Sequence, residues 1–167
     1  DGEGIEYSFS EKPSRAQKEP ILNSVWFARM KDTYKVLVFN EINKEVADSI
    51  MLSSGFAGFE AISPSWLGFL FTAIKSEDFH RKKDLYCTGA TQMSLTNEGL
   101  ARLEWLFPSE DVVEKFNQVI KPSVDLILIL QKRNRNLRAS RDLLLPKLIS
   151  GELDVSELDI EIPAEAK

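Results

Sequence analysis

Basic and amide-bearing side chains gather in four short segments of the sequence, PSRAQK, ARMK, HRKK and GATQ. Lysine and arginine neutralise phosphates, while arginine, glutamine and asparagine also pair with base edges in the major groove of duplex DNA. We therefore predict DNA contact in and beside these segments. The candidate DNA-binding residues are Lys12, Ser14, Arg15, Gln17, Lys18, Arg29, Lys31, Arg81, Lys82, Lys83, Thr91 and Gln92.

Each of these positions also has a plainer explanation. Surface lysines are common in any protein, and the run 81–83 is equally typical of a solvated helix end. Aromatic rings are a second kind of candidate because they stack on bases, but Trp26, Phe27, Trp66 and Phe69 each lie within an apolar stretch. We predict that these four rings belong to the core.

Catalytic chemistry finds little support in the sequence. His80 is the only histidine and Cys87 the only cysteine, so the sequence offers no cysteine pair and no His/Asp/Glu spacing typical of a metal site. No glycine-rich loop joins a strand to a helix in the phosphate-binding form, and TGA at 88–90 is too short to count. We predict no catalytic residue, no metal and no cofactor. A free-standing enzyme would need a site that the sequence does not offer.

The same features bear on the compartment. A single cysteine allows no internal disulfide, and nothing resembles a secretion signal or a membrane span of roughly 20 apolar residues. These observations predict a cytoplasmic protein with no membrane partner. The chain begins at Asp1 rather than at methionine, which suggests a processed product or an expressed fragment.

Regular elements must position the candidate residues, and most of the chain has the pattern of a small α+β domain. SVWFARM (24–30) and YKVLVFN (34–40) are rich in β-branched and aromatic residues, which predicts the two strands of a hairpin. A Ser/Gly-rich stretch, 53–63, follows. Residues 64–79 begin with proline and repeat apolar residues at helical spacing, which predicts one helix packed on the sheet.

The next stretch, residues 85–110, completes the predicted domain. It contains a glycine loop, a short helix that Thr96 or Asn97 caps, and a strand that ends at Pro108. A chain of 167 residues with 43% apolar content is large enough for one domain with a core, or for a small domain and an extended element. We therefore predict an α+β fold with a small mixed sheet over residues 1–108.

Residues 109–150 predict one long helix. Ser109 is followed by acidic residues, which the dipole of a first helical turn favours, and the end is marked by Pro146 and Gly151. At ~1.5 Å per residue the helix is about 63 Å long, so it needs a partner helix. Pro122 leaves two helical pieces as the alternative. The apolar seam has heptad spacing and runs through Val113, Phe116, Ile120, Ser123, Ile127, Leu130, Asn134, Leu137, Arg141, Leu144 and Leu148.

Asn134 and Arg141 are polar positions in the C-terminal half of this seam, one heptad apart. A buried polar residue at a core position costs stability but penalises misaligned pairing, so these two side chains are candidate register residues. The alternative is an imperfect seam whose polar side chains reach solvent.

Charge is divided unevenly along the chain. The net charge of −5 argues against simple nucleic-acid binding, but residues 109–150 carry 8 Lys/Arg against 5 Asp/Glu, and residues 151–167 carry 1 against 6. Most of the excess acid therefore lies in the tail. Because this tail has no apolar helical period, we predict a solvated or loosely docked end over 151–167.

The order of these motifs resembles a known family, the DNA-specificity subunits of type I restriction-modification systems. LRASRDLLLPKLISGELDVSEL (137–158) is similar to the end of their C-terminal conserved region. The pieces that look like a target recognition domain are KPSRAQKE (12–19), SVWFARMKDTYKVLVF (24–39), SSGFAGFEAISPSWLGFLF (53–71), DFHRKKD (78–84) and TGATQMSLTNEGLARLEWLFPSE (88–110). The resemblance covers nearly the whole chain.

The resemblance implies a target recognition domain over 1–108, incomplete at its N-terminus, a conserved helix over 109–150 that forms an antiparallel coiled coil, and an acidic tail over 151–167. It implies that the chain recognises double-stranded DNA without catalysing a reaction. The implied partners are methyltransferase (modification) subunits, a restriction/translocase subunit, and a second copy or the other half of the specificity subunit. A full-length subunit of this family usually has two recognition domains and two long helices, whereas this chain has one of each.

A structural module of a different class is the alternative. The long helix would then serve oligomerisation, and the globular domain would bind protein rather than DNA. Salt-dependent binding to duplex DNA separates the two hypotheses, because phosphate contacts weaken steeply with salt.

Overall fold

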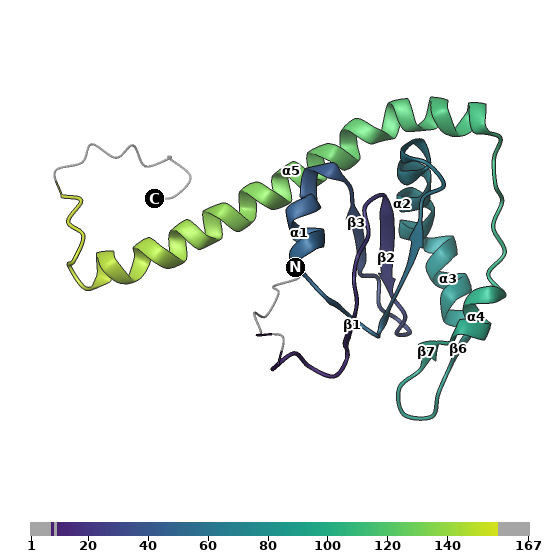
Figure 1. The fold of residues 1–167 in the computed structure, drawn as a ribbon, viewed down its shortest axis with the longest axis horizontal. Helices are drawn as coiled ribbons and strands as arrows, with labels where there is room; N and C mark the ends of the chain where they lie inside the picture. The colour runs from purple at the N-terminus through teal and green to yellow at the C-terminus, as the bar shows by residue number, and fades with distance from the viewer. Residues whose placement is uncertain (1–7, 9, 157–167) are drawn as a thin grey trace. The chain divides into compact units, whose positions relative to one another are not determined.

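The computed structural model describes residue 8 and residues 10–156 of the chain. It combines small β-sheets with helices and a long C-terminal helix, which confirms the α+β prediction (Figure 1). The chain divides into two compact units, 1–128 and 129–167. Residues 157–167, which make up most of the predicted acidic tail, lie outside the described residues, as do residues 1–7 and 9.

The elements follow one another in a mixed order. The strands are β1 (Ala16–Lys18), β2 (Ser24–Ala28), β3 (Val36–Phe39), β4 (Leu52–Ser53), β5 (Phe56–Glu60), β6 (Cys87–Thr88) and β7 (Ser94–Leu95). The helices are η1 (Glu41–Asn43), α1 (Lys44–Ser49), η2 (Pro64–Trp66), α2 (Leu67–Lys75), α3 (Glu77–Leu85), α4 (Asn97–Ala101) and α5 (Glu110–Ile149).

A three-stranded antiparallel sheet in the order β3-β2-β5 organises the first unit. The predicted hairpin is confirmed, because Ser24 of β2 lies opposite Phe39 of β3, and Phe27 opposite Val36. Two further antiparallel pairs, β1 with β4 and β6 with β7, complete the described sheets. Both are short, so their positions depend on the loops and helices around them.

Alternation along the strands divides the core into two layers. Val25 and Phe27 are fully buried on one face, against α2, α3 and the first part of α5. Trp26 lies on the other face, where Ala47 of α1 and Leu52 of β4 cover it. Figure 1 shows α2 and α3 on one side of the sheet and α1 on the other.

The four aromatic side chains predicted to belong to the core are buried to different extents. Phe27 is in the first layer, and Trp26 and Trp66 are partly buried against the two layers. Phe69 is half-buried and meets Trp66 edge to face at a centroid distance of 5.8 Å. These contacts are those of packing residues.

Strand β5 lies within the Ser/Gly-rich stretch 53–63, for which no regular element was predicted. Gly58 of β5 pairs with Trp26 of β2, and a Cβ at Gly58 would lie 2.4 Å from Cδ2 of the indole. The glycine is therefore a consequence of strand packing, since only hydrogen fits beneath the ring. Composition alone gave no indication of this strand.

The single helix predicted over 64–79 is wrong. The stretch forms η2, α2 and the start of α3, with a break at Ser76, whose backbone is extended. The Ser76 hydroxyl accepts a hydrogen bond from the Phe79 amide at 3.2 Å, and Glu77 and Asp78 fill the first turn of α3. A serine followed by two acidic residues is the pattern of a helix N-cap. Ser76 is therefore both the residue at which α2 ends and the N-cap of α3.

Residues 85–110 match their prediction in part. Thr96 caps α4 by accepting a hydrogen bond from the Gly99 amide at 3.1 Å, as predicted. The strand predicted to end at Pro108 is wrong, because residues 103–109 have no regular structure. Trp105 fixes this segment by packing against Phe59 at 5.5 Å and Phe79 at 5.4 Å between ring centroids. Side-chain packing therefore replaces strand pairing there.

Helix α5 is continuous through Pro122, so the two-piece alternative is wrong. In the first unit its contact face is Val113, Val124 and Leu128, which are buried, with Ile120 partly buried against the same core. A Cβ at Gly68 of α2 would lie 2.4 Å from Cγ2 of Ile120, so the two helices are in close contact. Ile120, predicted to pair with another helix, thus packs on its own domain.

Within the second unit, α5 continues to Ile149 and ends as predicted. The Gly151 backbone has φ +74°, its amide donates to the Leu148 carbonyl at 3.3 Å, and the Leu153 amide donates to the Lys147 carbonyl at 3.0 Å. This is the glycine-terminated end expected of the sequence. Leu130, Leu137, Leu144 and Leu148 of the predicted seam are all exposed.

None of the described helices is both long and apolar enough to span a bilayer.

Candidate nucleic-acid interface

The first candidate segment forms a turn that leads into β1. The Ala16 amide donates to the Pro13 carbonyl at 2.8 Å, and the Gln17 side-chain amide donates to the Ser14 carbonyl at 2.7 Å. Arg15 is exposed, and its carbonyl accepts a hydrogen bond from the Ser54 amide at 2.7 Å. The backbone of this turn is thereby fixed to the β4–β5 turn.

The β4–β5 turn is also hydrogen-bonded to the residue that follows β2. The Gly55 carbonyl accepts a hydrogen bond from the Arg29 amide at 2.8 Å. Arg29 then joins the next segment, because its carbonyl accepts from the Leu95 amide at 2.9 Å and the Lys31 amide donates to Met93 at 3.0 Å. A continuous run of backbone hydrogen bonds therefore connects Arg15 to the β6–β7 loop.

The Arg29 side chain takes part in this connection. Its Nε donates to the Leu95 carbonyl at 2.6 Å, and its Nη2 donates to Oδ1 of Asn97 at 2.9 Å. Arg29 is half-buried, and these two hydrogen bonds use two of the five N–H donors of its guanidinium within the domain. Arg29 positions the loops, and the contact with Asn97 was not predicted from the sequence.

Thr91 and Gln92 lie exposed in the loop between β6 and β7. Gly89 opens this loop with φ +131°, and a Cβ there would lie 2.5 Å from the Gln92 carbonyl oxygen. Both facts favour glycine, because the left-handed backbone and the close approach each penalise a side chain. The tight turn presents Thr91 and Gln92 at the surface.

Lys83 requires a correction, because the structure places it inside the domain. Its side chain is fully buried, and Nζ donates to the Met30 carbonyl at 2.9 Å and the Thr33 carbonyl at 2.8 Å. Oδ1 of Asp84 lies 3.2 Å from the same ammonium. A buried lysine in this setting fixes α3 to the β2–β3 turn and is not available to a phosphate.

Arg81 and Lys82 lie on the exposed side of α3. Both pair with Asp78, Arg81 through Nη2 at 2.6 Å and Lys82 through Nζ at 2.7 Å. These hydrogen bonds, that from Lys82 first, lower the pKa of the Asp78 carboxyl. The acid offsets one of the two positive charges, so the local surface is less basic than the sequence indicates.

Three of the four candidate segments thus meet at one end of the first unit, which we call the loop end and which comprises residues 12–18, 29–33, 54–55 and 89–93. Figure 1 shows the β1–β4 pair and the β6–β7 loop at the end of the central sheet away from the first part of α5. The longest-range strand pairing at this end is the bridge between Met30 and Ser94, which are 64 positions apart in the sequence. Lys12 lies beside Met51, with 3.9 Å between Nζ and Sδ, Lys18 is exposed on β1, and Lys31 is half-buried.

Sequence reasoning missed Asn97 and the turn at Ser54 and Gly55 as parts of this end. Neither had a signal, since their proximity depends on how β4, β5 and β7 pair with distant strands. Met30 and Met93 were also missed, although both side chains are exposed there. Flexible thioethers of this kind adapt to varied contact surfaces.

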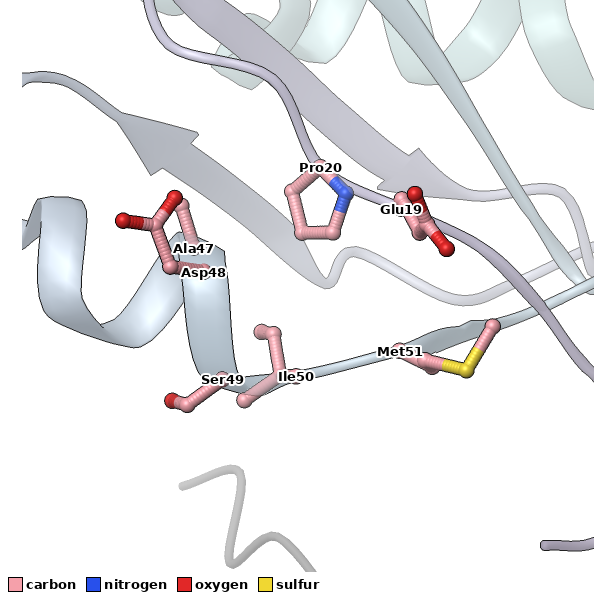
Figure 2. A pocket seen from close by; sticks show the side chains of 7 residues that line it. All are labelled: Glu19, Pro20, Ala47, Asp48, Ser49, Ile50 and Met51. Carbon is pink, nitrogen blue, oxygen red and sulfur yellow. The ribbon is translucent and has the colours of Figure 1, made fainter. Parts of the chain in front are cut away.

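A separate cleft of about 300 Å³ lies between the β1–β2 connection and the end of α1 (Figure 2). Its lining residues are Glu19, Pro20, Ala47, Asp48, Ser49, Ile50 and Met51. Two carboxylates and no cation among the lining residues make the cleft a poor site for DNA, because phosphates are repelled. None of the predicted DNA contacts lines it.

His80 and Cys87 are both internal. The His80 imidazole is buried, meets Tyr34 and Phe79 at 4.6 and 5.5 Å between ring centroids, and has no hydrogen-bond partner on either nitrogen within the described structure. Burial, assisted by the charge of Lys83, lowers the pKa of His80. Burial likewise raises the pKa of the Cys87 thiol. No group of three or more His, Cys, Asp or Glu side chains in the described part of the chain is placed to hold a metal ion.

We expect stability to fall below about pH 6.5 because of His80. The unfolded chain binds a proton near the ordinary pKa of histidine, whereas the folded chain resists protonation, so falling pH favours unfolding until the lowered pKa is reached. Urea unfolding midpoints at about pH 7.5 and 5.5 measure this. His80→Phe should flatten the difference, and parallel losses in both proteins would contradict the role given to His80.

Comparisons with known proteins bear directly on this site. The chain is 40% identical over 53 residues to the type I restriction enzyme MjaIX specificity subunit of Methanocaldococcus jannaschii, a match that covers 32% of this chain and 12% of that protein. It is 28% identical over 86 residues to the type I restriction enzyme HindI specificity subunit of Haemophilus influenzae, covering 51% of this chain and 19% of the other. Parts of this chain are therefore related to type I specificity subunits. The suspected resemblance is confirmed at this level.

The extent of these matches is limited. The chain spans about an eighth and a fifth of the length of the two curated relatives. No protein-family model and no solved structure matches the chain.

Proposed function

We propose that this chain recognises a DNA sequence as a specificity subunit, or half-subunit, of a type I restriction-modification complex. In this role it catalyses no reaction. It binds double-stranded DNA through the loop end and positions methyltransferase and restriction/translocase subunits on the target. The cytoplasm is the expected location of such a complex.

The observation that carries the proposal is the convergence of Arg15, Gln92 and Lys31 at the loop end. Backbone hydrogen bonds connect the three segments that bear them, while Arg15 and Gln92 are exposed. An arginine and a glutamine on fixed turns are side chains that pair with base edges, and nearby cations add phosphate contacts. The partial relationship to proteins named as specificity subunits agrees with this chemistry.

Assembly through α5 is the second part of the proposal. We infer that the helix pairs antiparallel with the equivalent helix of a second copy or of the other half of the subunit. The exposed leucines between Leu130 and Leu148 support pairing, because heptad-spaced apolar side chains gain free energy when a partner helix covers them. The same exposed leucines also favour the alternative, an oligomerisation module whose domain does not bind DNA.

Arg15→Ala and Gln92→Ala should each weaken binding to the cognate duplex by about 1–3 kcal/mol and leave binding to scrambled duplexes nearly unchanged. The cognate sequence is first obtained by selecting bound duplexes from a random pool with the assembled complex. Arg81→Ala/Lys82→Ala is the matched comparison, because loss of phosphate contacts weakens all duplexes alike and reduces the salt slope.

If Arg15→Ala weakens binding to the cognate and the scrambled duplex equally, Arg15 contacts phosphates rather than bases. If the unaltered complex binds no duplex at low salt, the oligomerisation module is the better description. Full binding by every variant would place the DNA surface away from the loop end.

A further inference from the structure

The part of α5 in the second unit has an unusually one-sided charge. Residues 126–141 contain five cations and no acid, so the nearest carboxylates along the helix are Asp125 and Asp142. The cations are Lys132, Arg133, Arg135, Arg138 and Arg141, and all five side chains are exposed. Paired helices usually alternate charges of both signs beside their seams. This stretch therefore does not have the charge pattern of a self-sufficient pairing surface.

Helical geometry places three of these cations on one ridge, which we call the basic ridge: Lys132, Arg135 and Arg138. They are three residues apart, so they lie side by side along about 9 Å of the helix at ~1.5 Å per residue. Lys132 and Arg135 lie on the opposite side of the helix from Leu130 and Leu137. Arg138 flanks the seam. Pairing through the leucines consequently leaves the basic ridge accessible.

Pairing with a second copy would raise the density of positive charge along this part of the helix. If two copies align around this stretch, ten positive side chains gather, and of these Arg141 of each copy pairs with Asp142 of its own helix at 2.7 Å. Like charges at this density repel, and the repulsion is relieved by a polyanion. The polyanion that the proposed function supplies is the DNA duplex, whose two strands carry one charge per about 1.7 Å of helix axis.

We propose that the basic ridge binds the phosphate backbone of the DNA duplex and contributes affinity without sequence preference. This inference rests on the proposed function and adds a second contact surface, outside the loop end. The ridge bears no group that selects among bases in this role, because phosphates are the same in every sequence. Two of its three members are arginines, whose planar guanidinium suits bidentate phosphate contact.

The test is Lys132→Gln/Arg135→Gln/Arg138→Gln in the full chain, assembled with its modification subunits. Glutamine keeps the helix propensity and removes the charge. The control is Lys44→Gln/Lys75→Gln/Lys115→Gln, which removes the same charge from exposed positions of the first unit. Binding to a cognate duplex and a scrambled duplex, each several helical turns long, is measured over a salt series. Circular dichroism and sedimentation check the helix content and assembly of each variant.

Loss of the ridge should reduce the slope of log affinity against log salt by up to about 3, at ~0.9 per phosphate contact, and weaken both duplexes by the same factor. The control should change the slope much less, and Lys132→Arg in an otherwise unaltered ridge should retain it. An unchanged slope in the ridge variant overturns the inference while leaving recognition by the loop end intact. Unchanged DNA binding with altered sedimentation would instead assign the ridge to an acidic protein partner. If the unaltered complex binds neither duplex, the proposed function fails and the ridge proposal fails with it.

Discussion

Lys83→Met should lower the free energy of unfolding of the first unit by about 3 kcal/mol. Methionine retains most of the buried volume but removes the ammonium, so the carbonyls of Met30 and Thr33 lose their donor and Asp84 loses its counter-charge. A buried group left without its hydrogen bond costs about 1–3 kcal/mol, and breaking one side of a buried ion pair costs about 3–5 kcal/mol. Urea unfolding followed by tryptophan fluorescence gives the change directly.

Lys82→Met is the control for this prediction. Lys82 adjoins Lys83 in sequence, but its pair with Asp78 lies at the solvent-exposed surface of α3, where such a pair adds little to stability. The expected order is a large loss for Lys83→Met and little change for Lys82→Met. Equal unfolding midpoints for the two variants would show that the buried ammonium does not stabilise the junction of α3 with the β2–β3 turn.

Leu137→Glu/Leu144→Glu should abolish self-association of the chain. The two leucines are 67% and 44% exposed, and they lie on the predicted seam one heptad apart. Each buried leucine contributes about 2 kcal/mol, and a charge placed in the seam adds a desolvation cost. In a pair of copies the change occurs four times. The dissociation constant should therefore rise at least a thousandfold, equivalent to about 4 kcal/mol.

Sedimentation over a concentration series measures this loss. Gln131→Glu/Ala139→Glu adds the same two charges to exposed positions of α5 outside the seam, so it should leave the oligomeric state unchanged. A monomeric, helical wild-type chain at micromolar concentration would contradict self-pairing and favour the other half of a specificity subunit as the partner. Equal dissociation by both double variants would show that charge, rather than seam burial, controls assembly.

Local sequence was sufficient for elements whose stabilising contacts are close in the chain. The hairpin of β2 and β3 follows from β-branched and aromatic runs with a short polar turn. Thr96 caps α4, and Gly151 closes α5, through contacts within a few residues. The length of α5 was likewise predicted from one heptad-spaced seam between the Ser109 start and the Gly151 end. Each of these depends on neighbours that the sequence itself places together.

Residues with long-range contacts were harder to interpret. Nothing in the sequence indicated a strand at Gly58, because the reason for the glycine is Trp26 on a distant strand. Ile120 was predicted to pair with another helix, and the structure places it against Gly68 of α2. Lys83 is a basic residue in the same short run as Arg81 and Lys82, yet of these three side chains only that of Lys83 is buried. A run of basic residues in the sequence shows that the side chains are charged but not which of them is buried. Burial of Lys83 depends on which side of α3 contacts the β2–β3 turn.

The sequence by itself therefore determined the α+β class, the hairpin, the long helix and the partial relationship to type I specificity subunits. Tertiary structure decided which candidate side chains remain at the surface. In the folded domain Arg15 and Gln92 lie at the same loop end, and the Arg29 side chain is hydrogen-bonded to the loops there. Lys83 is buried inside the domain. The physical reason is that capping and periodicity act over one or two turns of chain, while exposure depends on strand pairing and helix packing between distant segments.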